Sequence, residues 1–186
     1  MKDGTKALCV YAGHNFGHNP NFAVDAEKLG HLMAESRIRL VYGAGNVGLM
    51  GAVSQAVLCR GGRAVGVTTP HIMAKQEPSQ EGIVLEVKDN LLDRKARLIE
   101  LSDAFCILPG GMGTLNEVSD VLVMHQIGET NLPVYFLNTD GYWNMFGTMI
   151  KEMIKDGFVK DQTEYNIHIY NSPEELINAY NARFFI

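Results

Sequence analysis

Short strand-like stretches, most of them apolar throughout, alternate with stretches of helical periodicity along the whole chain. The strand-like stretches span residues 7–12, 38–43, 64–68, 83–87, 104–108, 133–137 and 166–170. Strands that are apolar on both faces are typical of a parallel sheet that helices cover on both sides. The sequence therefore predicts an α/β protein with a mostly parallel sheet.

Between these stretches, apolar residues recur at the spacing of one helix face. The pattern predicts helices over residues 22–33, 49–57, 91–102, 115–127 and 142–156, and Ser172 with Glu175 forms a capping box that opens a last helix. No repeat, low-complexity tract or linker interrupts the alternation. At 186 residues, of which 46% are hydrophobic, the chain is long enough for one well-packed core. We expect a single domain over residues 1–186.

Charge and cysteine usage exclude several classes of protein. The net charge of −5 provides no basic field for nucleic acid or for an anionic membrane. Cys9, Cys59 and Cys106 fit neither a disulfide set nor a metal-site spacing, and the six histidines form no ligand pattern. We expect Cys9 and Cys106 to be core residues, and the chain to work in the cytoplasm, without a metal or other cofactor.

Two glycine-rich segments follow predicted strands. In a parallel α/β sheet, ligands bind at the carboxyl ends of the strands, where these loops lie. The stretch LPGGMGTLNE, residues 108–117, places Gly110, Gly111, Gly113 and Thr114 before a helix. Glycines permit positive φ and close approach of a ligand, and the amides of a helix N-terminus favour an anion. This pattern predicts a phosphate site; the alternative is a tight turn that needs glycine for packing alone.

The other segment, GAGNVG at residues 43–48, matches the dinucleotide pattern G-x-G-x-x-G. A dinucleotide site also requires an acid at the end of the next strand, and that strand ends VGVTTP. A nicotinamide-dependent enzyme is therefore disfavoured. We interpret Gly45 and Gly48 as part of a second turn that favours anions and faces the first.

Glu117 and Arg94 are the charged residues most in need of explanation. A carboxylate near a helix N-terminus is stabilised by the helix dipole, so Glu117 has a capping role open to it as well as a chemical one. Arg94 and Lys95 lie in the first turn of a predicted helix, where a cation is unfavourable. They are either a solvated pair, or Arg94 reaches over the strand ends to a phosphate or to Glu117 with bidentate geometry.

These motifs resemble the LONELY GUY family of phosphoribohydrolases, often labelled lysine decarboxylases. The family pattern P-G-G-x-G-T-x-x-E is met from Pro109 to Glu117, and Arg94-Lys95 and the run from Ser102 to Phe105 also match. The resemblance implies a Rossmann-like fold, a homodimer or larger assembly, and cleavage of the base–ribose bond of a nucleoside 5′-monophosphate. It implies Arg94 and Glu117 as the catalytic pair. It implies nucleotide contacts from Glu77, Lys95 and the 110–116 loop, which holds Gly110, Gly111, Met112, Gly113, Thr114, Leu115 and Asn116.

The chain departs from the family pattern at several positions. Leu91-Leu92 stand where Met-His is usual, His14-Asn15 where Ser-Ser is usual, Val123-Met124 where Thr-Trp is usual, and Ala44 replaces a glycine. These departures predict a base preference other than isoprenylated adenine. A decarboxylase would need a cofactor such as pyridoxal phosphate, for which no lysine pattern is present. The alternative from another class is a carrier or sensor that binds a phosphorylated ligand without turnover.

Overall fold

The computed structural model describes residues 5–75, 81–161 and 165–185 of the chain. The strands are β1 (Ala7–Tyr11), β2 (Arg39–Tyr42), β3 (Ala64–Thr68), β4 (Ile83–Val87), β5 (Ala104–Ile107), β6 (Val134–Leu137) and β7 (Ile167–Tyr170). The helices are α1 (Asn21–Glu35), α2 (Gly48–Cys59), α3 (Pro70–Met73), α4 (Leu91–Glu100), α5 (Met112–Gln126), α6 (Asn144–Lys155) and α7 (Pro173–Phe184), with a 3-10 turn η1 (Thr139–Gly141) before α6.

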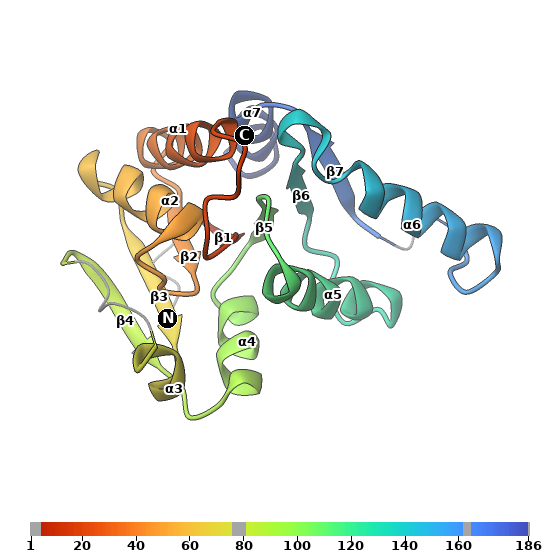
Figure 1. Ribbon diagram of the computed structural model, residues 1–186, viewed down its shortest axis with the longest axis horizontal. Helices are drawn as coiled ribbons and strands as arrows, with labels where there is room; N and C mark the ends of the chain where they lie inside the picture. The colour runs from red at the N-terminus through yellow and green to blue at the C-terminus, as the bar shows by residue number, and fades with distance from the viewer. Residues whose placement is uncertain (1–4, 76–80, 162–164, 186) are drawn as a thin grey trace.

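The described strands form one seven-stranded sheet in the order β4-β3-β2-β1-β5-β6-β7. Each of the six neighbouring pairs is parallel, so the prediction of a parallel sheet is confirmed. β1 pairs with β2 on one side and with β5 on the other. The chain therefore builds outward from β1 to β4, returns to β5, and then builds in the opposite direction (Figure 1).

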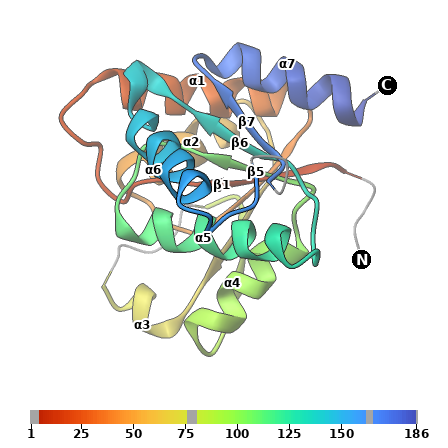
Figure 2. The ribbon, with the colours of Figure 1, turned by 90° about the vertical axis from the view of Figure 1, so that its right-hand side faces the viewer.

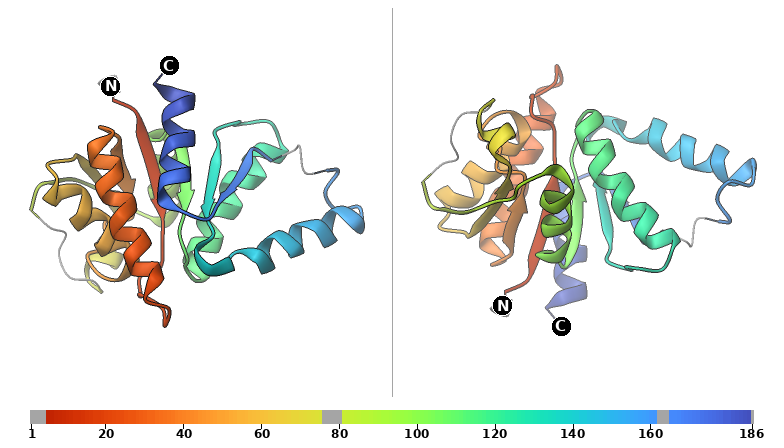
Figure 3. Two further views of the ribbon diagram at one scale, coloured as in Figure 1. Left: turned by 90° about the horizontal axis from the view of Figure 1, so that it is seen from above. Right: turned by 90° about the horizontal axis from the view of Figure 1, so that it is seen from below.

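Helices cover both faces of the sheet, as the apolar strands require. Leu8 and Val10 of β1 belong to a core that α1, α2 and α7 complete. Cys9 and Tyr11, which alternate with them, belong to a second core shared with α4 and α5. Figure 2 shows α1 and α7 above the sheet and α4 and α5 below it. The two further views in Figure 3 show the same layers from above and from below. These layers make the fold Rossmann-like.

The two cysteines expected in the core lie there. Cys9 and Cys106 are fully buried in neighbouring strands, and Cys59 is exposed. Burial raises the pKa of both core thiols well above the usual value, so these groups stay protonated and act as small apolar side chains. The prediction of their role is therefore confirmed.

Two local features differ from the sequence-based expectation. Helix α5 begins at Met112 rather than at residue 115, so Gly113 and Thr114 belong to its first turn. Helix α3 was not expected, because four residues are too few to show a helical period. It forms because the Thr69 hydroxyl accepts the N–H of Ile72 at 3.3 Å, with Pro70 at the first helical position.

Candidate active site

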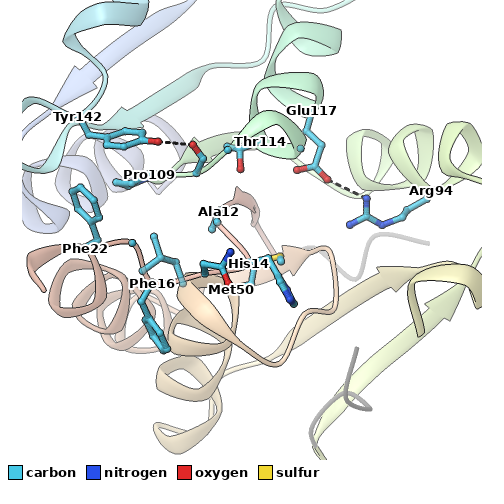
Figure 4. Close-up of a pocket in the computed structure, with 17 residues that line it drawn as sticks. Ala12, His14, Phe16, Phe22, Met50, Arg94, Pro109, Thr114, Glu117 and Tyr142 are labelled. Atoms are coloured by element: carbon cyan, nitrogen blue, oxygen red, sulfur yellow. Dashed lines mark hydrogen bonds and ion pairs between the residues drawn. The ribbon is translucent and has the colours of Figure 1, made fainter. Parts of the chain in front are cut away.

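A pocket of about 440 Å³ lies at the carboxyl ends of β1 and β5. The order of the sheet reverses between these two strands, and this is where open α/β sheets bind their ligands. The loop after β1, the first residues of α2, the loop after β5, the first turns of α5, Arg94 of α4 and Tyr142 line it (Figure 4). The chain topology thus brings segments from five regions of the sequence to one site.

The N-terminus of α5 opens into this pocket. Gly111 stands at the N-cap without a side-chain cap, and its carbonyl accepts the N–H of Leu115 at 3.0 Å. No described residue accepts a hydrogen bond from the amides of Met112, Gly113 or Thr114. A helix N-terminus with free amides is suited to an anion.

The glycines of this loop serve different purposes. None of Gly110, Gly111 and Gly113 has positive φ, so the left-handed conformation is not the reason for them. A Cβ on Gly110 would collide with the Thr114 side chain, which is the packing explanation. A Cβ on Gly111 or Gly113 would meet only open space. Packing therefore leaves these two unexplained, and room for a ligand close to the backbone accounts for them.

At the other glycine-rich segment, the second and third amides of α2 already have an acceptor. The N–H groups of Leu49 and Met50 both point at the Gly13 carbonyl, at 3.0 and 3.4 Å. Gly48 has positive φ, and a Cβ there would collide with the backbone of His14. Gly45 and Gly48 are not among the residues that line the pocket. The interpretation of this segment as an anion-binding turn is thus not supported by its geometry, because another loop already occupies the helix end.

Arg94 reaches over the ends of the strands, as one of the two hypotheses had it. Asn90 caps α4 by accepting the N–H of Asp93 at 3.0 Å, which places Arg94 in the first turn. The arginine is 8% exposed. Its Nε donates to the Val67 carbonyl at 2.9 Å and Nη2 donates to the Gly43 carbonyl at 3.4 Å. Two backbone carbonyls therefore hold the guanidinium in one orientation.

The remaining nitrogen of the guanidinium contacts the candidate carboxylate. Arg94 Nη1 donates to Glu117 Oε1 at 3.1 Å. The contact is through a single oxygen, whereas bidentate geometry was expected, because Nε and Nη2 are already used by the carbonyls. A Cβ on Gly43 would collide with the guanidinium, so this glycine makes room for the arginine.

Glu117 lies in the second turn of α5 and is partly buried, with 15% of its side-chain surface exposed. Burial raises the pKa of its carboxyl above the ordinary 4.5, and Arg94 and Lys95 counteract that shift. Asp120 adds to the rise. A carboxylate with a raised pKa, held by a buried guanidinium inside a cleft, is typical of a catalytic group rather than of a helix cap.

Several residues expected to bind nucleotide do not line the pocket. The ammonium of Lys95 contacts Asp120 at 2.7 Å and Asn116 at 3.1 Å, so it ties α4 to α5 outside the cleft. Met112 is 80% exposed, and Leu115 packs partly against the core. Contacts of these residues with a ligand stay a prediction. Glu77 lies outside the described residues.

The structure adds residues that sequence reasoning missed. Tyr142, Phe22, Phe16 and Met50 line the pocket. The signal for Tyr142 was available, because it follows a predicted strand and therefore belongs to the same edge of the sheet. Among the positions that depart from the family pattern, His14 and Asn15 line the pocket, whereas Leu92 is 73% exposed and Met124 lies outside it.

Within residues 5–75, 81–161 and 165–185, no three His, Cys, Asp or Glu side chains lie where they could share a metal ion. No described helix combines the length and the apolar character that crossing a bilayer requires. The fold and the pocket together define a class: a Rossmann-like α/β protein with a ligand site where the strand order reverses.

Comparison with known proteins identifies the family. Residues 50–180 match the family described as "Possible lysine decarboxylase". Cytokinin riboside 5′-monophosphate phosphoribohydrolase LOG7 of Arabidopsis thaliana is 38% identical over 95% of this chain and 81% of its own length. The LOG5 protein of the same plant is 36% identical over 98% of this chain and 80% of its own length. The chain belongs to this LONELY GUY family, so the resemblance noted in its motifs is confirmed.

Solved structures agree on the fold. A molybdenum cofactor binding protein from Rippkaea orientalis superposes with a TM-score of 0.71 at 22% identity, covering 96% of this chain and 97% of that one. The molybdenum cofactor carrier protein of Chlamydomonas reinhardtii superposes with a TM-score of 0.72 at 19% identity, covering 97% and 98%. At these identities the likeness establishes the Rossmann-like architecture and no activity.

Proposed function

We propose that this protein hydrolyses the N-glycosidic bond of a nucleoside 5′-monophosphate, releasing the free base and ribose 5-phosphate. The relatives of known activity are phosphoribohydrolases of cytokinin riboside 5′-monophosphates. One observation carries the proposal in this chain. The Arg94–Glu117 pair lies beside the free amides of α5, within a single pocket.

The free amides of α5 and the Thr114 hydroxyl bind the 5′-phosphate. An anion at a helix N-terminus is stabilised both by the amides and by the helix dipole. The phosphate does not react, so its binding energy serves to position the ribose at the catalytic pair.

Glu117 acts on the reacting carbon. As the bond between C1′ and the base nitrogen breaks, its electron pair leaves with the base and positive charge develops on the ribose. The Glu117 carboxylate stabilises that charge and accepts a proton from the water whose oxygen bonds to C1′. The departing base takes up one proton from solvent and Glu117 later returns its proton to solvent, so the products are the neutral base and ribose 5-phosphate. Arg94 keeps the carboxylate in place. Glu117 is the one carboxyl group among the described residues that line the pocket, so this scheme uses a single carboxylate from this chain.

We further propose that the protein acts as a homodimer or larger assembly of one-domain subunits. Val118, Val121 and Leu122 of α5 are buried within the chain, so they need no partner. On the opposite face of α5, Met112 and Val123 are 80% and 53% exposed, and the C-cap residue Ile127 is 61% exposed. Exposed apolar residues on one helix face favour a protein partner. Sedimentation at assay concentration tests the assembly, and an active monomer would contradict a shared site.

The free cysteines suit the cytoplasm.

The function is tested with a panel of nucleoside 5′-monophosphates and the matching nucleosides. We expect free base and ribose 5-phosphate from AMP or a related nucleotide, and hardly any base from adenosine. Equal rates on AMP and adenosine would contradict the phosphate site. Tight nucleotide binding without release of base from any member of the panel would make the protein a carrier.

A further inference from the structure

The turn between β6 and α6 has two consecutive residues with left-handed backbone, for which its Asp-Gly sequence is suited. Asp140 has a φ of 51° and Gly141 a φ of 77°, so two consecutive residues are left-handed. Left-handed backbone is uncommon for residues other than glycine and is retained where the surrounding structure holds it. The turn leads directly to Tyr142, which is 42% exposed and lines the pocket.

Side-chain hydrogen bonds fasten this turn to α1. The Asp140 carboxylate accepts from the Asn19 amide at 2.7 Å and from the Asn21 amide at 2.8 Å. The Thr139 hydroxyl donates to Asp25 at 2.6 Å. The lowered pKa of Asp140 follows from the two amide donors. The turn is therefore fixed to a helix more than a hundred residues earlier in the chain, which leaves Tyr142 little freedom to move.

The Tyr142 hydroxyl contacts the glycine-rich loop between β5 and α5. It donates to the Gly110 carbonyl at 2.6 Å, and the Phe22 ring meets the Tyr142 ring edge-on, with centroids 5.3 Å apart (Figure 4). In a planar trans peptide the C=O and the next N–H point in opposite directions. A bond to the Gly110 carbonyl therefore also fixes the direction of the Gly111 N–H.

The peptide between Gly110 and Gly111 is one that needs such a restraint. Both of its residues lack a Cβ, so rotation of the peptide meets less steric resistance than it would between other residues. Gly111 lines the pocket and stands at the N-cap of α5, next to the free amides. Rotation of this peptide would turn a carbonyl oxygen toward the place where an N–H now points.

We propose that Tyr142 is a positioning residue that holds the Gly110–Gly111 peptide in its phosphate-binding orientation. The proposal rests on the proposed function, since it assigns the anchor of the same phosphate site. Tyr142 acts through the loop and not on the reacting bond. Its loss should therefore weaken the binding of phosphorylated ligands and spare the chemical step.

The test is Tyr142→Phe, which removes only the hydroxyl and keeps the ring against Phe22. Ribose 5-phosphate affinity is measured by calorimetry, and kcat and KM are measured on AMP and on adenosine. We expect the dissociation constant of ribose 5-phosphate and the KM of AMP to rise about tenfold, the worth of one hydrogen bond. The kcat on AMP and the slow rate on adenosine should stay within about twofold of wild type.

Tyr170→Phe is the matched control, because Tyr170 is also partly exposed but lies on β7, outside the pocket lining. It should leave all four quantities unchanged. Unchanged ribose 5-phosphate affinity in Tyr142→Phe, or an equal loss on AMP and adenosine, would overturn the proposal. So would wild-type protein that fails to bind ribose 5-phosphate. Wild-type protein that binds ribose 5-phosphate yet cleaves no nucleotide would refute the hydrolase function, while the calorimetry would still decide the role of Tyr142.

Discussion

Two glycine-rich loops of this protein lie at the same edge of the sheet but differ in whether the helix amides that follow them have an acceptor within the chain. The first three amides of α5 have no acceptor among the described residues, while the second and third amides of α2, those of Leu49 and Met50, point at the Gly13 carbonyl. Both carry three glycines, and both precede a helix without a side-chain cap. Glycine content therefore does not identify an anion site. What decides is whether a neighbouring loop supplies the acceptor in place of a ligand.

Gly13 explains why the two loops differ. Its own N–H donates to the Pro109 carbonyl at 2.9 Å, while its carbonyl faces α2. One residue of the loop after β1 therefore contacts both glycine-rich segments, but it fills the helix end of only one. The loop before α2 supplies the Gly43 carbonyl that accepts from Arg94, and the loop before α5 lines the pocket itself.

The largest expected effect concerns Glu117, the carboxylate that α5 brings to the pocket. Glu117→Gln keeps the size of the side chain and removes its charge, so release of base from AMP should fall by on the order of 10²–10⁴. AMP affinity should persist or increase, because the variant no longer repels the phosphate. Calorimetry beside the rate assay separates the two quantities.

Arg94→Ala and Glu152→Gln complete this experiment. If Arg94 and Glu117 act as a unit, the double variant should be little slower than the slower single variant. Glu152 pairs with Lys155 on the surface of α6. Glu152→Gln is therefore the matched control, and it should leave the release of base and the AMP affinity unchanged. A Glu117→Gln protein with the wild-type rate would remove this residue from the mechanism.

The pH dependence of the rate tests the same residue without mutation. Because burial raises the pKa of Glu117 above 4.5, the active carboxylate is lost at a higher pH than for an ordinary glutamate. Below that pKa the rate should fall about tenfold per pH unit, and this dependence should vanish from the residual activity of Glu117→Gln. A rate that stays constant down to pH 4.5 would contradict the raised pKa.

The same shift affects stability with a definite sign. The folded state binds the Glu117 proton more tightly than the unfolded chain does. Its contribution to the free energy of unfolding is therefore complete below the pKa that Glu117 has in the unfolded chain. That contribution is lost as the pH rises through the pKa of Glu117 in the folded protein.

A pair of glycine substitutions tests the comparison of the loops directly. Gly113→Ala adds a Cβ in open space within a helix, so it should raise stability by about 0.5–1 kcal/mol. It should also weaken ribose 5-phosphate binding, because the methyl group enters the ligand's space. Gly48→Ala forces a Cβ against the His14 backbone at positive φ and should lower stability by about 1–3 kcal/mol. Thermal melting measures the stability of both variants, and calorimetry measures their affinity for ribose 5-phosphate. A Gly113→Ala protein that is destabilised and binds ribose 5-phosphate as wild type does would refute the phosphate site at the loop before α5.

The smallest expected effect concerns the choice of base. Of the positions that depart from the family pattern, His14 and Asn15 line the pocket. Changing both to serine should shift the ratio of kcat/KM between AMP and isoprenylated AMP only a few-fold, since pocket contacts of this kind discriminate weakly. An unchanged ratio would show that these two residues do not set the base preference.

The sequence alone determined the framework of the protein. The apolar runs marked the strands, their alternation with helices implied a parallel sheet, and chain order then placed both glycine-rich loops at one edge. These conclusions depend on local periodicity, which the sequence displays directly. Glu117 and Arg94 also stood out there, because each is a charge whose position in its helix needed a reason.

The tertiary structure alone decided which loop is free and what holds it. That Gly13 fills the end of α2, that two carbonyls orient Arg94, and that Tyr142 anchors Gly110 are contacts between distant segments. A backbone carbonyl has the same chemistry at every residue, so the sequence gives no sign of which one a donor will meet. Only the folding of the loops around the point where the strand order reverses brings these groups within hydrogen-bond distance.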